Sequence, residues 1–492
     1  MTRGLAAATL LFHLATSRGY GYFRDELYYL ACSAHPALGY VDFPPLLALL
    51  LRPWRAVFGD SVPALRLLPA IAAAAAVLVT GAIVRALGGD RRAELTALVP
   101  VMVAPIYVGT FSILTPNALD VVMWAAVLLV AVRLLELPST RDWVALGVLF
   151  GIGFLNRHGI VFLGVGLAAG LVLTPARRLL VTRGPWIAAA IALVLILPHL
   201  VWQVANGWPT LEFLANARRM KMLERSPLAF VAEQVLVLNP VAAAIWIAGL
   251  VSLWRRDGGR HRALAWAYLT ILVLMIAGAG KTYYLTPFYT LLFAAGAIAL
   301  AGHRRLATTI TVAVLVVGIV TAPLAKPLLS EERLVDYARV LGQDPRAGID
   351  ERHELGLLPQ HFADQHGWPE LAATVADVLG RLPADDRAHA CIFAANYGEA
   401  GAIDFFGPAH ALPHAISGHN SYWLWGPGTC DFSTVVTIGL EPADVRDHVQ
   451  SVTEAAHVDC PYCMPYEQRP ILVTRGLTIP RDELWRRAKA FR

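Results

Sequence analysis

Long runs of apolar residues, separated by short polar turns, fill the first two thirds of the chain. A helix that spans a membrane needs about 20 mostly apolar residues, because it must satisfy its own backbone hydrogen bonds. No cleavage pattern follows the first run, so we expect an uncleaved span there. The two short runs in the middle fit either thin spans or a re-entrant pair. The pattern predicts about eleven spans, at residues 4–17, 65–87, 95–114, 118–135, 143–156, 160–176, 185–203, 229–253, 263–280, 284–301 and 306–323.

The pattern changes after residue 325, where charged residues become frequent and strand-like runs alternate with helix-like runs. This alternation predicts a small α/β layer domain. We therefore expect a polytopic α-helical membrane domain over residues 1–325 and a C-terminal soluble α/β domain over residues 326–492, here called the tail. Within the tail, the pattern predicts strands at 388–395, 434–438 and 471–474 and helices at 375–379, 398–406, 442–456 and 481–491.

Composition and charge agree with a membrane protein. Hydrophobic residues make up 57% of the chain and charged residues only 16%, whereas an ordinary soluble domain has roughly 25% charged residues. The net charge of +5 does not indicate a nucleic-acid partner, because most arginines form short clusters between apolar runs. These clusters lie in alternate loops, so the positive-inside rule predicts a multi-pass cell-membrane protein with a cytoplasmic N-terminus and, given an odd number of spans, an extracytoplasmic tail.

One predicted outer loop departs from this rule. The count of spans places residues 204–228 outside, yet this loop is rich in basic residues: Arg218, Arg219, Lys221 and Arg225. Either the loop binds a lipid phosphate, or the number of spans differs from eleven by one pair.

Four of the five cysteines lie in the tail, and two of them form the C-x-x-C pattern of Cys460 and Cys463. This usage suits an oxidising compartment, and we expect a disulfide between this pair. A zinc site is the alternative, but it would need two further ligands, for which His457, Cys391 and Cys430 are available.

The predicted outer loop at residues 18–64 contains the most informative residues. Asp25 and Glu26 open an amphipathic helix directly after the first span. Acids in a first helical turn complement the helix dipole, which is the structural alternative to a catalytic role. Pro44 and Pro45 then start a helix at about 45–58, which is too short to span and is expected to lie along the membrane interface.

This loop resembles family 39-type integral membrane glycosyltransferases. The resemblance rests on Phe23-Arg-Asp-Glu-Leu-Tyr-Tyr and Gly39-Tyr-Val-Asp-Phe-Pro-Pro-Leu, with weaker support from Thr115-Pro-Asn-Ala-Leu-Asp120 and Lys281-Thr-Tyr-Tyr. The family includes dolichyl-phosphate-mannose protein mannosyltransferases and the aminoarabinose transferase of lipid A. The resemblance covers roughly residues 20–300 and implies the glycosyltransferase C-type fold, a polyprenyl-phosphate-sugar donor, inversion at the anomeric carbon and an active-site acid that matches Asp25.

The chemistry of such a transfer needs a base and positive charge. A carboxylate such as Asp25, with Glu26 beside it, can accept the proton of the acceptor hydroxyl. Positive charge must stabilise the phosphate leaving group. Residues at span ends can instead snorkel to lipid headgroups, and the family often has Lys-Tyr where this chain has Arg-His at 157–158. The expected donor-phosphate ligands are Arg24, Arg157, His158, Lys281, Tyr283 and Tyr284.

Three further acids are expected to support the site: Asp42, Asp120 and Glu233. An acid near the end of a span is costly unless it faces a cavity, which favours a functional role for Asp120. The alternative for Asp42 is a turn residue before Pro44 and Pro45, although support of catalysis is favoured, and for Glu233 a functional and a structural role are equally expected. His199 is expected to be a packed histidine. Some C-type relatives use a divalent cation, and Asp25, Glu26 and Asp120 would offer it oxygen ligands, although no spacing requires one.

The tail contains a loop rich in aromatic and amide side chains, which suits sugar or acceptor binding. Its candidate residues are His419, Asn420, Tyr422, Trp423 and Trp425. The alternative is that the tryptophans pack on the domain or dip into the membrane interface. No motif ties the tail to characterised enzymes, and acceptor selection is the role we expect for it.

The predicted function is therefore transfer of a sugar to a glycan, lipid or protein acceptor on the outer face of the membrane. A membrane transporter or flippase is the main alternative, but transporters often contain internal repeats and mid-membrane polar residues. No repeat is evident, and the polar residues gather at the outer ends of spans. A receptor with a passive anchor would not require eleven spans.

Overall fold

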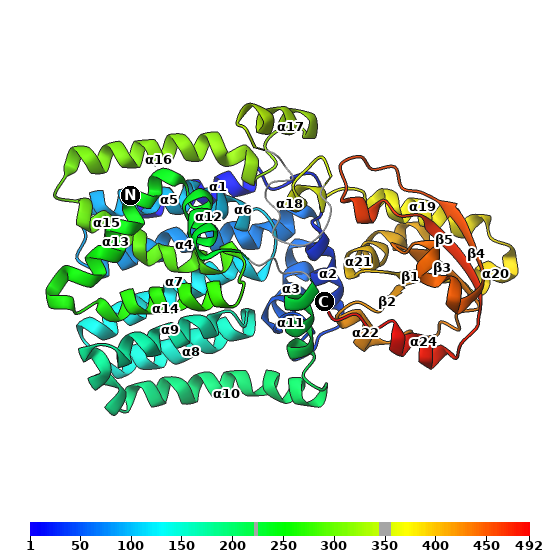
Figure 1. Cartoon of the computed structure of the whole chain (residues 1–492), viewed down its shortest axis with the longest axis horizontal. Helices are drawn as coiled ribbons and strands as arrows, with labels where there is room; N and C mark the ends of the chain where they lie inside the picture. The colour runs from blue at the N-terminus through cyan, green and yellow to red at the C-terminus, as the bar shows by residue number, and fades with distance from the viewer. Residues whose placement is uncertain (221–224, 344–355) are drawn as a thin grey trace.

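The computed structural model describes residues 1–220, 225–343 and 356–492, so Lys221 of the basic loop lies outside the described residues. The membrane domain is helical, and its helices lie side by side to the left of the tail in Figure 1. Their bounds are α1 (Thr2–Ala15), α4 (Val62–Ala86), α5 (Arg91–Val103), α6 (Pro105–Thr110), α7 (Pro116–Glu136), α8 (Thr140–Asn156), α9 (Ile160–Val172), α10 (Gly184–Ala205), α12 (Pro227–Val237), α13 (Ala243–Arg255), α14 (Arg262–Ala277), α15 (Tyr289–Leu300) and α16 (Arg304–Ala325).

Length and composition support fewer spans than the sequence predicts. Within the described residues, 5 helices are long and apolar enough to cross a membrane, or up to 7 if each bent pair counts as one span. The predicted span 229–253 is not a straight helix. It breaks into α12 and α13, which meet at 107°, because Asn239 adopts φ 76° and Pro240 follows it and cannot donate a helical hydrogen bond. The run 160–176 likewise ends in a bend of 110° before the 3₁₀ turn Pro175–Val181.

The first outer loop folds into two short helices, α2 (Arg24–Ala34) and α3 (Leu46–Phe58). Together with α11 (Pro209–Met220), they lie between the membrane helices and the tail in Figure 1. Side chains of α2, including Leu27 and Tyr28, belong to the same hydrophobic core as Val436 and Ile471 of the tail sheet. The loop and the tail therefore share one core.

The tail is an α/β domain built on a five-stranded sheet of order β2-β1-β3-β5-β4. The strands β1, β2 and β3 are parallel, and β5 and β4 add antiparallel. The strands are β1 (Cys391–Ala394), β2 (Ala415–Ser417), β3 (Thr434–Ile438), β4 (Val449–Ala456) and β5 (Ile471–Leu477). The helices are α17 (Glu331–Val340), α18 (Gln360–Ala363), α19 (Trp368–Arg381), α20 (Ala384–His389), α21 (Tyr397–Phe406), α22 (Ser421–Trp425), α23 (Pro442–Val445) and α24 (Arg481–Arg487).

The helix predicted over residues 442–456 is wrong for most of its length. Only α23 and the 3₁₀ turn Arg446–His448 are helical, and residues 449–456 form the edge strand β4, which pairs with β5. The β-branched residues Val449, Val452 and Thr453 favour an extended backbone, and the free edge of β5 provides the hydrogen-bond partners.

Two glycines allow α21 of the tail to approach α2 closely. A Cβ atom at Gly398 would lie 2.1 Å from Cγ of Arg24, and one at Gly401 would lie 2.9 Å from the backbone carbonyl carbon of Leu27. The carboxyl ends of the parallel strands β1 and β2 lead directly to Tyr397 and His419, so the edge of the sheet where ligands usually bind in α/β proteins faces the first outer loop.

Candidate active site

Two cavities meet at the carboxylates of the first outer loop. The tail cavity has a volume of about 540 Å³ and lies between α2, α6, the end of α16 and the tail. The bundle cavity has a volume of about 590 Å³ and lies between α2, the turn after α8, α10 and α11. Both cavities are lined by Asp25, Asp42, Asn117, Phe213, Tyr283 and Tyr284. These shared residues mark the place where two substrates could meet.

Asp25 lies in the first turn of α2, at the junction of the cavities, with 26% of its side chain exposed. The hydroxyl of Tyr397, from the tail, donates a hydrogen bond of 2.8 Å to Asp25 Oδ1. Within the described part of the chain, Asp25 Oδ2 has no hydrogen-bond partner. One carboxylate oxygen is thus held by the tail and the other is available to a substrate.

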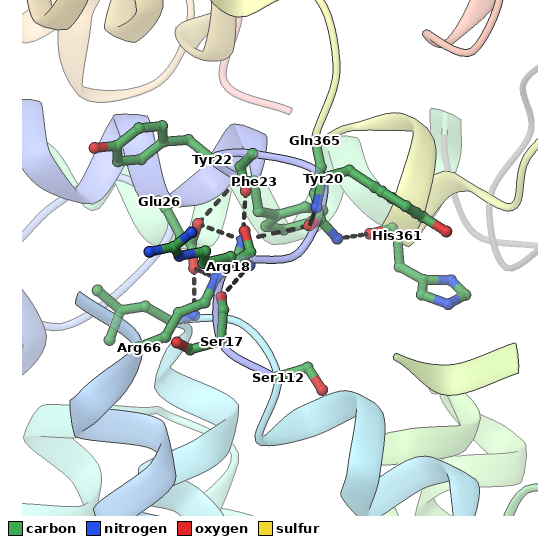
Figure 2. A network of polar contacts seen from close by, with 12 residues as sticks. Ser17, Arg18, Tyr20, Tyr22, Phe23, Glu26, Arg66, Ser112, His361 and Gln365 are labelled. Atoms are coloured by element: carbon green, nitrogen blue, oxygen red, sulfur yellow. Dashed lines mark hydrogen bonds and ion pairs between the residues drawn. The ribbon is translucent and has the colours of Figure 1, made fainter. Parts of the chain in front are cut away.

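Glu26, predicted beside Asp25 as catalytic, is fully buried and lines neither cavity. Figure 2 shows it at the centre of a polar network with Arg66, whose Nε and Nη2 lie 2.9 Å from the two carboxylate oxygens. Glu26 also accepts hydrogen bonds of 2.8 Å from the backbone N–H groups of Phe23 and Leu114. A buried carboxylate with this many donors anchors the loop. The structure therefore gives Glu26 a structural position.

Arg24 lines the tail cavity, but its guanidinium faces groups of the tail. It donates to the Tyr466 hydroxyl, lies 3.7 Å from Asp364 Oδ2 and stacks over the ring of Tyr397. Burial raises the pKa of Asp364 to about 6, while Arg24 opposes this rise. Arg24 thus joins the loop to the tail, and its role as a donor-phosphate ligand stays a prediction.

The bundle cavity contains a cation framed by aromatic rings. Arg157 lies 4.4 Å above the centroid of the Tyr284 ring and 5.6 Å from that of Tyr283. Its Nη1 is 3.3 Å from Oδ2 of the buried Asp120, so Asp120 holds Arg157 in place. Lys281 lies 5.9 Å from the Tyr283 ring and lines the tail cavity. Two cations thus flank the tyrosines that both cavities share.

His158 and His199 form a pair beside this cation. Their Nε2 atoms are 3.0 Å apart, and His199 Nδ1 lies 2.9 Å from the carbonyl oxygen of Leu38. A carbonyl only accepts, so His199 donates from Nδ1 and its Nε2 must accept from His158. Both rings line the bundle cavity. His199 is therefore packed, as the sequence predicts, but it also orients His158 within the cavity.

Of the predicted supporting acids, Asp42 lines the cavities and Glu233 does not. Asp42 lines both cavities and accepts a hydrogen bond of 2.8 Å from the Tyr28 hydroxyl. Glu233 lines neither cavity and pairs with Arg225 at 3.0 Å. The basic loop thus has a carboxylate partner for one of its arginines.

The aromatic loop of the tail is mostly packed. Asn420 lines the tail cavity, whereas Tyr422 is buried and donates to Asp404. Trp425 stacks on His35 with ring centroids 4.1 Å apart, and Trp423 packs against Phe491. His419 stacks on Tyr397. The tryptophans therefore make packing contacts, which is the alternative that the sequence leaves open.

Disulfides join Cys460 to Cys463 and Cys391 to Cys430. Among the described residues, no group of three or more His, Cys, Asp or Glu side chains could hold a metal ion. Asp25, Glu26 and Asp120, which would offer oxygen ligands to a divalent cation, each face a different partner: Tyr397, Arg66 and Arg157. The three carboxylates do not form a common metal site.

Several residues of the site escape the sequence analysis. Asn117 and Phe213 line both cavities, and Tyr397 bonds to Asp25 across 372 positions of sequence. The only local signal for Tyr397 is its place after the predicted strand at 388–395, where a loop at the end of a strand often carries function.

The comparisons with known proteins agree with this architecture. A family model described as dolichyl-phosphate-mannose-protein mannosyltransferase matches residues 42–202. The lipid A galacturonosyltransferase RgtD of Rhizobium johnstonii is 28% identical over 267 residues, which are 52% of this chain and 54% of that protein. The chain thus spans about half the length of this curated relative.

Solved structures extend the likeness to the whole fold. ArnT from Cupriavidus metallidurans bound to undecaprenyl phosphate superposes with a TM-score of 0.63, and its apo state with 0.60. Each covers 96% of this chain and 97% of the other at 15% identity, so the likeness concerns the fold. The sequence matches and the shared fold confirm the predicted resemblance: this multi-pass membrane protein is similar to the family 39-type integral membrane glycosyltransferases.

Proposed function

We propose that the protein transfers a sugar from a polyprenyl-phosphate donor to the hydroxyl of an acceptor, and that Asp25 is the base. The observation that carries this proposal is the junction of the two cavities at Asp25 and Asp42. A group-transfer enzyme must bring two substrates to one point, and the junction provides a carboxylate there.

The bundle cavity suits the lipid donor. It is lined by apolar side chains of the membrane helices and α11, including Phe154, Phe162 and Leu200, which match a polyprenyl chain. Arg157 beside Tyr283 and Tyr284 would hold the phosphate, because a guanidinium can grip two phosphate oxygens at once. ArnT from Cupriavidus metallidurans, which shares this fold, binds undecaprenyl phosphate, and this supports the same class of ligand here.

The tail cavity then receives the acceptor. Its wall combines helix residues with Gln360, Asn420 and Arg492 of the tail. In the proposed step the acceptor oxygen attacks the anomeric carbon, the bond from that carbon to the phosphate oxygen breaks, and the acceptor proton passes to Asp25. Attack from the face opposite the phosphate inverts the anomeric configuration. The polyprenyl phosphate leaves with the electron pair, stabilised by Arg157 and Lys281.

The outer face is the proposed site of reaction. The tail carries both disulfides, which suit an extracytoplasmic compartment. We accordingly assign residues 1–325 to the membrane transferase domain and residues 326–492 to an extracytoplasmic domain. The acceptor is a glycan, a lipid or a protein at that surface.

Replacing Asp25 tests the proposal. Mass spectrometry would compare lipid extracts of null cells carrying an empty vector, the wild-type gene, Asp25→Asn or the control Asp60→Asn. Asp60 lies in the same loop but pairs with Arg55 and lines neither cavity. We expect a polyprenyl-phosphate sugar to accumulate with the empty vector and with Asp25→Asn, because loss of a general base slows transfer by about 10²–10⁴-fold.

Wild type and Asp60→Asn should consume that lipid. A wild-type lipid profile in Asp25→Asn cells would remove Asp25 as the base. The transporter hypothesis would gain if no lipid-linked sugar changed in any strain.

A further inference from the structure

Both carboxylates at the junction of the cavities are hydrogen-bonded to a tyrosine that the tail supplies or fixes. Tyr397 of the tail donates to Asp25 Oδ1 at 2.8 Å. The hydroxyl of Tyr28 lies 2.8 Å from Asp42 Oδ1 and 2.8 Å from Ser421 Oγ of the tail. A carboxylate can only accept, so the Tyr28 proton goes to Asp42 and the Ser421 hydroxyl donates to Tyr28.

Ring stacking and a backbone hydrogen bond fix the position of Tyr397. It is the first residue of α21, directly after the N-cap Asn396. Its ring is stacked between those of Tyr28 and His419, with centroids 4.5 Å and 4.7 Å away. Its backbone N–H donates to His419 Nδ1 at 3.2 Å, so His419 carries its proton on Nε2, which lies 2.8 Å from the carbonyl oxygen of Arg492. The phenol hydroxyl is thus held in one position.

The position suits a hydrogen-bond donor to the base. Burial raises the pKa of Tyr397 well above its ordinary value, so the phenol keeps its proton. A hydrogen bond from a phenol to a carboxylate oxygen is short and strong. The bond to Oδ1 leaves Oδ2, which has no partner within the described residues, as the oxygen that faces the acceptor.

We propose that Tyr397 is a positioning residue of the catalytic site, through which the tail orients the Asp25 carboxylate toward the acceptor hydroxyl. The inference rests on the proposed function, in which Asp25 is the base. It gives the tail a second role besides acceptor selection: the membrane domain contributes the base, and the tail fixes its orientation.

The test uses the full-length protein in liposomes and the variant Tyr397→Phe, which keeps the ring stacking and removes the hydroxyl. The donor is the lipid extract of the null strain, in which the lipid-linked sugar accumulates. We expect kcat to fall about 10–100-fold, because a small misplacement of a reacting group carries such a cost. KM for the lipid-linked sugar should stay within about twofold. The acid limb of the pH–rate profile should move to higher pH, because a carboxylate that has lost this hydrogen bond binds a proton more readily.

Two comparisons separate positioning from general structural damage. Tyr22→Phe is the matched control: Tyr22 packs against Phe405 of the same helix α21, but its hydroxyl donates to the backbone oxygen of Asp60. Binding of undecaprenyl phosphate to each purified variant reports on the folded state without catalysis. Tyr22→Phe should match wild type in every measurement, and Tyr397→Phe should match it in binding alone.

The inference is overturned if Tyr397→Phe retains the wild-type kcat and pH profile. It is also overturned if Tyr397→Phe loses undecaprenyl phosphate binding in proportion to activity, because the hydroxyl would then support the fold and not the base. Failure of the proposed function gives a different result, in which Asp25→Asn itself turns over the lipid-linked sugar.

Discussion

Two neighbouring acids of α2 have opposite surroundings. Successive residues on a helix point about 100° apart, so the turn that directs Asp25 into the cavities directs Glu26 into the protein. There Glu26 meets Arg66 (Figure 2), which is itself buried. Arg66 also donates to the backbone oxygen of Gly21. The same pair of adjacent acids thus provides a carboxylate that lines both cavities and the anchor that holds its helix.

A buried acid of the tail should make stability depend on pH. Burial raises the pKa of Glu399 to about 7, although backbone N–H donors of the α21 N-terminus and the charges of Arg469 and Arg24 oppose the rise. A carboxyl whose pKa is raised on folding contributes stability that is complete below its unfolded pKa and is lost as the pH rises through its folded value. Between pH 5 and pH 8 the loss is on the order of 2 kcal/mol.

Thermal unfolding of the wild type and of Glu399→Gln measures this effect. Glutamine keeps an oxygen acceptor but cannot ionise, so the variant should gain stability relative to the wild type as the pH rises from 5 to 8. The difference between the two proteins, and not either curve alone, isolates Glu399 from other titrating groups. A difference that is independent of pH would contradict the prediction.

The sequence predicts Asp25 as the base but does not distinguish its surroundings from those of Glu26. The motif places both acids at the start of one helix, and only the contact with Arg66, 40 positions away, shows which of them is buried. Tyr397 has no such motif, because its role depends on a contact across 372 positions. Local patterns report on local chemistry, whereas the environment of a side chain depends on the tertiary fold.

At the scale of elements, the site depends on the close contact of α2 with α21. Because Gly401 packs on the backbone of Leu27, an added methyl group cannot be accommodated by rotating a side chain. We expect Gly401→Ala to push α21 away from α2 and to reduce transferase activity at least about 10-fold through the Tyr397–Asp25 contact. The activity of purified protein, with limited proteolysis of the tail as a second readout, measures this.

Gly380→Ala is the control for that substitution. Gly380 lies in helix α19, and a Cβ atom there would meet nothing within 4 Å. Alanine is a better helix former than glycine, so this variant should match or slightly exceed the stability of the wild type. Equal activity of Gly401→Ala and Gly380→Ala would show that the helix contact does not control the site.

The pattern of residues predicts elements well where one periodicity dominates. The strand at 434–438 has the predicted bounds, whereas residues 449–456 form a strand because β5 offers them a free edge. The predicted span 229–253 is mostly apolar apart from Glu233 and Gln234, and only Asn239 and Pro240 mark its bend. Hydropathy measures how apolar a run is but not whether it is straight.

At the scale of the whole molecule, the tail is expected outside the cytoplasm. Variants that each add one cysteine to the native protein, labelled with a membrane-impermeant maleimide, test this in intact cells. Asp377→Cys, on the exposed face of α19, should react in intact cells, and Arg92→Cys, exposed at the start of α5, should react only after lysis. The native cysteines give little background, because four are disulfide-bonded and Cys32 is buried. The reverse labelling pattern would invert the assigned orientation.

The distance along the chain between Asp25 and Tyr397 also sets the timing of biosynthesis. The ribosome must add 372 residues after Asp25 before the partner of that carboxylate exists. The membrane helices are made first, so a half-finished chain can already present its apolar groove to lipids while the carboxylate still lacks its partner. If Asp25 is the base, as proposed, a chain without its tail would bind the lipid-linked sugar but lack a correctly oriented base. The last-made domain would then complete the reactive centre, so that transfer could begin only after the tail has been translated.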